Sequence, residues 1–166
     1  MNRKTVGSFC VVCLGLVPFS LAPARAMPAQ DTGKNHCDMT ERGNMAMGFD
    51  AASTTHHFRV NGSGGTIEVT ANDPADAESQ AAIQGHLQHI AKMFQEGDFD
   101  IPALVHNRIP PGVPTMKRLK TEIAYRYIAT EQGGGVELSS QDAEAVSAIH
   151  DFLDFQIKEH QTGDKP

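Results

Sequence analysis

The chain has 166 residues and a formal net charge of −6, with 20 acidic against 14 basic side chains. This excess of negative charge argues against nucleic acid or an anionic lipid surface as a partner, because both would repel the chain. The length fits a single domain with a hydrophobic core of its own, preceded by a short targeting segment.

Residues 1–26 have the pattern of a secretory signal peptide. Arg3 and Lys4 form a basic start, an apolar stretch follows over residues 6–21, and Ala24-Arg25-Ala26 is a small-residue cleavage site. The apolar stretch is too short and wrongly flanked for a membrane span. We therefore predict cleavage near Ala26 and a periplasmic or secreted location.

Cleavage would change the charge and the cysteine content of the chain. Loss of the three basic residues before residue 27 leaves 11 basic against 20 acidic residues, a net charge of −9 that favours cations as partners. Only Cys37 remains, which excludes an internal disulfide. Residues 27–52 are rich in Gly, Asn and Asp without periodicity, so we predict a flexible N-terminal arm there.

Residues 53–97 have the pattern of a ββα unit. Alternating apolar and polar residues predict two strands joined by a hairpin turn. Asp73 is the expected N-cap of the helix, with Pro74 in its first position, and the helix runs to about Glu96, where Gly97 ends it. The expected strands and turn cover residues 55–60, 66–71 and 61–65.

Residues 98–120 break this pattern. Prolines are frequent there, and the apolar residues between them predict an ordered Pro-rich loop that packs on the domain. A second ββα unit follows over residues 121–163. Its expected strands and helix cover residues 122–129, 136–140 and 141–161.

The two units align with each other. Residues 64–73 match residues 133–142, and after a three-residue deletion residues 77–98 match residues 143–164. We therefore predict an α+β fold built from a duplicated ββα-ββα unit, a single domain over residues 53–166. The simplest architecture is a four-stranded antiparallel sheet with two helices on one face, and the strand order stays open.

The aligned helices differ at one flank. The first helix has His86 and His89 where the second has Phe152 and Phe155, and Met93 lies on the same strip of the helix. Two imidazoles and a thioether suit copper in either oxidation state better than calcium or magnesium, which prefer oxygen ligands. The alternative is that both histidines are half-exposed and bonded to the Pro-rich loop.

Other residues could complete a metal site. Alternation along the first strand turns His56 toward the helices and His57 toward solvent. The Pro-rich loop adds His106 and Met116, and its stiff prolines could hold a ligand in place. Ordinary core filling is the alternative for Met116.

The arm has a second soft cluster, formed by His36, Cys37 and Met39. It could capture copper, whereas Met47 and Phe49 are more easily explained as residues that pack on the domain.

Common catalytic signatures are missing from the sequence, including HExxH, a Gly-rich phosphate loop and a CxxCH haem motif. His150 and His160 have no histidine at the aligned positions of the first unit, so we expect surface or capping residues near a helix end.

Four stretches resemble a family of small secreted bacterial proteins. They are MGF at residues 47–49, THHF at 55–58, HLQHIAKMF at 86–94 and PPGVP at 110–114. The resemblance covers nearly all of the chain after residue 26. It implies a secreted location and no particular activity.

These observations predict a periplasmic metal-binding protein that acts in binding, delivery or resistance, with copper as the metal and zinc as the alternative. Two other hypotheses stay open. One is a metal-dependent secreted enzyme of unknown substrate, and the other is a metal-free module that binds a periplasmic protein partner or forms a homodimer. The expected ligands are His56, His86 and His89, supported by Met93, His106 and Met116.

Overall fold

The computed structural model of the protein describes residues 32–166, with side chains from Asp38 onward. The predicted signal peptide, residues 27–31, and the side chains of His36 and Cys37 lie outside the described residues. Residues 32–166 belong to one compact unit.

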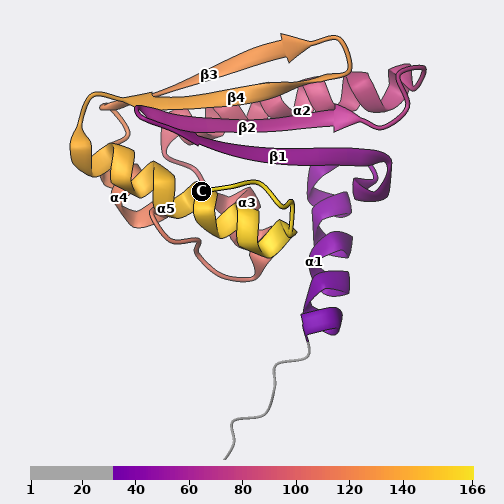
Figure 1. Ribbon diagram of the computed structural model, residues 1–166, viewed down its shortest axis with the longest axis horizontal. Helices are drawn as coiled ribbons and strands as arrows, with labels where there is room; N and C mark the ends of the chain where they lie inside the picture. Colours follow the sequence, from indigo (N-terminus) through magenta and orange to yellow (C-terminus); the bar gives the residue numbers. More distant parts are fainter. Residues whose placement is uncertain (1–31) are drawn as a thin grey trace, which may run out of the picture. The chain divides into compact units, whose positions relative to one another are not determined.

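Four antiparallel strands form one sheet in the order β1-β2-β4-β3, which confirms the predicted α+β class (Figure 1). Each hairpin pairs consecutive strands, and the two hairpins meet through β2 and β4 at the centre. The strands are β1 (Thr54–Asn61), β2 (Gly64–Ala71), β3 (Ile123–Thr130) and β4 (Gly133–Ser140).

The two hairpins have matching positions in the sheet. Each strand of the second hairpin begins and ends 69 residues after its counterpart, as Thr54 and Ile123 illustrate. Ile67 and Val136, which are related by the same shift, are direct partners across β2 and β4. The registers are therefore compatible with an approximate twofold axis between these two residues, and the duplication stays a prediction.

Two long helices, α2 (Ala77–Glu96) and α5 (Ala143–His160), pack on the same face of the sheet, as predicted (Figure 1). Alternation along the strands turns one set of side chains toward them. Ile67, Val136 and Leu138 belong to this buried set, and burial of such apolar side chains stabilises the fold.

The start of α2 differs from the sequence prediction. Asp76 is the N-cap, and its carboxylate accepts a hydrogen bond of 3.0 Å from the Ser79 amide. Asp73 instead accepts from the amide of Ala75 at 2.8 Å, which stabilises a turn before the helix. The predicted end is confirmed, since Gly97 adopts the left-handed conformation, with φ of 80°.

The predicted arm contains regular structure. A helix, α1, covers Thr32–Met47, and a short 3-10 turn, η1, covers Ala51–Ser53. The expectation of an arm without secondary structure is therefore wrong for these residues. Tertiary packing explains the difference, because Met39 and Phe49 are buried against the rest of the domain although the segment is polar overall.

The Pro-rich segment is ordered, as predicted, and contains two short helices. They are α3 (Asp100–His106) and α4 (Val113–Arg118). Gly112 caps α4 with φ of 78°, and a Cβ atom there would lie 2.0 Å from the carbonyl oxygen of Ala148 on α5. Close contact between this turn and α5 therefore requires glycine at residue 112.

Candidate functional site

A pocket of about 520 Å³ lies against the helix-facing side of β1 and β2. Its walls include residues of α1, η1, α2, α3, α5 and the C-terminal tail. Apolar side chains form most of the lining, and histidines from four different elements supply much of the rest.

The sheet provides one wall through the alternation of β1. Thr54, His56 and Phe58 line the pocket together with Thr55 at the start of the strand, whereas His57 and Arg59 do not. This arrangement confirms that His56 faces the helices and that His57 lies on the other side of the strand.

Helices α2 and α5 provide facing walls through residues spaced four apart. His86, Ile90 and Phe94 line the pocket from α2. Phe152, Gln156 and His160 line it from α5. These are the positions that the sequence alignment of the two units makes equivalent, with polar and apolar types exchanged at each pair.

Helix α1 provides a fourth wall. Met39, Gly43 and Met47 fall on one face of the helix and line the pocket. Arg42 fastens α1 to α3, because its Nε lies 3.1 Å from the carbonyl oxygen of Leu104 and 2.9 Å from that of Val105. These carbonyls belong to the last turn of α3, where a cation is favourable.

Ring-to-ring contacts connect the pocket histidines, with Phe49 between two of them. The centroid of Phe49 lies 5.7 Å from that of His86 and 6.4 Å from that of His56. His56 stacks on His160 at 5.7 Å with an interplanar angle of 17°, and His160 meets His106 edge-on at 5.1 Å. Such contacts hold the imidazoles in defined orientations.

Burial keeps two of these imidazoles neutral. Desolvation lowers the pKa of His56 to about 4, with a smaller contribution from His57. Desolvation likewise lowers the pKa of His86 to about 4, helped by His56 and His89. At neutral pH, each ring therefore offers one N–H donor and one nitrogen acceptor.

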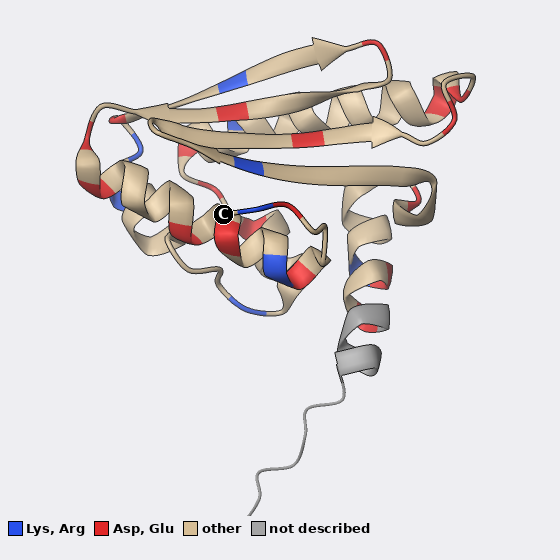
Figure 2. Ribbon diagram, viewed as in Figure 1, with Lys and Arg blue, Asp and Glu red and all other residues tan. Residues whose placement is uncertain are grey.

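The lining contains no Asp, Glu, Lys or Arg among residues 38–166. Acidic and basic residues are instead spread over the helices, strands and turns of the molecule (Figure 2). An uncharged wall with neutral imidazoles is a low-polarity environment in which an unpaired charge is costly.

His106 lines the pocket from α3. Its side chain has no exposed surface, and its Nε2 donates to Oε1 of Gln156 at 2.8 Å. Burial also lowers the pKa of His106. Because its ring packs edge-on against Phe155 at 4.9 Å and against His160, His106 fixes the position of the His160 ring.

The structure brings together some of the predicted metal ligands and not others. His56, His86, His106 and Met39 all contribute to the pocket. The side chain of His89 is exposed on α2, Met93 is half-buried outside the pocket, and Met116 is fully buried in the core. Among the residues with described side chains, no three His, Cys, Asp or Glu form a group that could hold a metal ion, so metal binding stays a prediction.

Sequence reasoning missed two pocket residues, Gln156 and His160. His160 lies at the end of α5, as expected, but it is half-buried rather than a plain surface residue, because the last turn of α5 packs over β1 and its ring stacks on His56 in the pocket. The available signal was that Phe152, Gln156 and His160 follow one another at intervals of four residues. His150 does lie at the surface of α5, where its Nε2 donates to the carbonyl oxygen of Asn61 at 2.9 Å.

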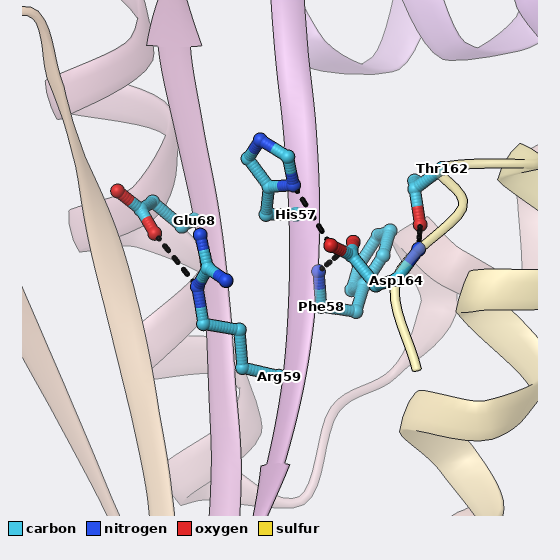
Figure 3. A network of polar contacts seen from close by, with 6 residues as sticks. All are labelled: His57, Phe58, Arg59, Glu68, Thr162 and Asp164. Carbon is cyan, nitrogen blue, oxygen red and sulfur yellow. Dashed lines mark hydrogen bonds and ion pairs between the residues drawn. The ribbon is translucent and has the colours of Figure 1, made fainter. Parts of the chain in front are cut away.

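The C-terminal tail lies beside β1, an edge strand of the sheet (Figure 3). Asp164 accepts from the amide of Phe58 at 2.9 Å and lies 2.9 Å from Nδ1 of His57. Desolvation alone would raise the pKa of Asp164, but the hydrogen bonds from Phe58, Thr162 and His57 together lower it. Thr162, two residues before this carboxylate, lines the pocket.

No family model, curated protein or solved structure matches the chain. Within residues 32–166, no helix combines the length and the apolar composition that crossing a bilayer requires.

Proposed function

We propose that the protein binds a small, largely apolar molecule in the pocket between the sheet and α1, α2, α3 and α5. The observation that carries this proposal is the pocket itself, about 520 Å³ with mostly apolar walls and a few polar groups. This volume and lining are typical of small-molecule sites, in which apolar contacts give affinity and a few polar groups give orientation.

The expected affinity is moderate. A ligand of about 20 non-hydrogen atoms contributes about −0.3 kcal/mol per atom, which corresponds to a Kd of tens of micromolar. Burial of the ligand would also remove apolar wall surface from water. Such an affinity fits binding or transport of a sparingly soluble compound.

Gly43 offers a direct test of this function. It is buried on α1, yet a Cβ atom there would meet only the terminal methyl of Met47, at 3.4 Å. A Gly43→Leu side chain would therefore occupy the pocket. Gly85 on α2 is a matched control, because it is exposed and a Cβ there meets nothing within 4 Å.

The assay is titration of the protein with N-phenyl-1-naphthylamine, an uncharged dye that fluoresces in apolar surroundings. We expect saturable binding by the wild type and by Gly85→Leu, and at least about tenfold weaker binding by Gly43→Leu. Equal binding by all three proteins, or by none, would refute the proposal.

Metal handling outside the cytoplasm is a second proposal, with copper first and zinc second. It is favoured by one observation, the presence of Met39, Met47, His56, His86 and His160 around a single pocket. Thioether and imidazole ligands suit Cu(I). Native mass spectrometry with Cu(I), Cu(II) and Zn(II) tests it, and stoichiometric binding that survives the replacement of both His56 and His86 would contradict a site in this pocket.

A further inference from the structure

We propose that the pocket selects uncharged aromatic molecules that carry a hydroxyl group and rejects the corresponding carboxylates. This inference rests on the proposed small-molecule function and names the ligand class. Three features of the pocket lead to it: the absence of charge from the described lining, the two unengaged imidazoles and the aromatic walls.

Charged ligands would find no counterion in the pocket. The neighbouring cation on α1, Arg42, already bonds two carbonyl oxygens of α3. Arg108 pairs with Glu159 at 2.7 Å and lies over the ring of Phe155 at 4.7 Å. A carboxylate would therefore lose its hydration without gaining a counterion, which is strongly unfavourable.

Cationic ligands meet the same obstacle. Asp164 belongs to the C-terminal tail, two residues after the pocket residue Thr162. Its carboxylate already accepts from the Phe58 amide and contacts His57. Neutral imidazoles do not compensate a positive charge. The pocket thus disfavours ions of both signs.

The imidazoles of His56 and His86 are polar groups that a ligand could engage. No described residue makes a hydrogen bond with their ring nitrogens, although both line the pocket. Two other polar groups of the lining are engaged, since the hydroxyl of Thr55 bonds the side chain of Asn72 at 2.6 Å and that of Thr54 bonds the carbonyl of Ala51 at 3.3 Å. The buried Nδ1 of His106 and Nε2 of Gln156 have no hydrogen-bond partner among the described residues, so they add further polar atoms to the wall.

A hydroxyl group matches these imidazoles because it can donate to a ring nitrogen and accept from a ring N–H. The body of the ligand is best aromatic, because Phe58, Phe94 and Phe152 line the same space. Ring-to-ring contact adds to the stabilisation that area burial alone provides.

The test compares 2-naphthol with 2-naphthoate, which share a ring system and differ in charge at neutral pH. Calorimetric titration of the protein should give at least about 100-fold tighter binding of 2-naphthol. Equal affinity, or tighter binding of 2-naphthoate, would overturn the inference while leaving the proposed function intact if the naphthylamine dye binds. Failure of all three compounds to bind would overturn both.

The role of the imidazole is tested with His86→Phe, which introduces the residue found at the aligned position 152. Loss of one hydrogen bond should weaken 2-naphthol about fivefold and leave naphthalene unchanged. His89→Phe, at an exposed position of the same helix, should change neither affinity. If His86→Phe weakens both compounds equally, or if neither is affected, the imidazole does not recognise the hydroxyl.

Discussion

Acidification from about pH 7 to about pH 5 should destabilise the fold, because His56 and His86 are held neutral inside the pocket. Both have pKa values of about 4 in the folded protein, against 6.5 for an unperturbed histidine. The unfolded chain therefore binds protons at pH 5 that the folded chain does not. The stabilisation is present above pH 6.5 and is lost as the pH falls toward 4.

The magnitude follows from these values. At about pH 5, each imidazole lowers the free energy of unfolding by about 2 kcal/mol relative to neutral pH, or about 4 kcal/mol for the pair. Burial of His106 acts in the same direction. Asp164 does not contribute in this range, because its pKa lies below its ordinary value of 3.8.

Urea denaturation followed by circular dichroism at the two pH values measures this loss. His86→Phe should reduce the difference between the two free energies of unfolding by about 2 kcal/mol, whereas Gln88→Ala, which replaces an exposed, uncharged residue on the same helix, should leave it unchanged. Other histidines face these rings and are present at both pH values. They are His57 and His160 beside His56, and His89 beside His86. A wild-type protein whose stability is the same at both pH values would refute the reasoning.

Two further predictions concern the tail and the turn before α4. Asp164→Ala removes the acceptor of the Phe58 amide, so hydrogen exchange of that amide should accelerate by at least about tenfold, and the tail should be cleaved faster by proteases than in the exposed control Asp151→Ala. Unchanged exchange would mean that the tail does not protect β1. Gly112→Ala forces a Cβ onto the carbonyl of Ala148 and should lower the free energy of unfolding by at least about 2 kcal/mol in thermal or urea denaturation. Gly62→Ala, with open space around it, should stay within about 0.5 kcal/mol of the wild type, and equal stability of both variants would contradict the close contact.

The regular parts of the fold could be predicted from local patterns. Alternation and turn residues located both hairpins to within a few residues, and Gly97 marked the end of α2. These features depend on neighbours in the sequence. The order of the strands does not depend on sequence neighbours, so the pairing of β2 with β4 became known only from the structure.

The parts that could not be predicted depend on distant contacts. The segment of α1 is polar and lacks clear periodicity, and its described part is held by the burial of Met39 and by the bonds from Arg42 to α3. Local propensity carries no information about such contacts.

Half of the six predicted metal ligands line the pocket, and contacts between distant parts of the chain decide which ones do. Strand alternation placed His56 correctly, since it requires only the period of the strand. On α2, His86 and His89 are three residues apart, and the sheet, α1 and α5 leave only His86 facing the pocket. The partners of His56, namely Phe49 and His160, come from opposite ends of the chain, and the sequence does not show that they meet.

The most direct test of ligand binding in this pocket is nuclear magnetic resonance of the imidazole carbons during titration with 2-naphthol. Binding between the sheet and α1 should shift the ring signals of His56, His86 and His160, while those of His89 and His150 stay in place. Shifts confined to His89 and His150, or no shifts at saturating ligand, would contradict a ligand site in this pocket.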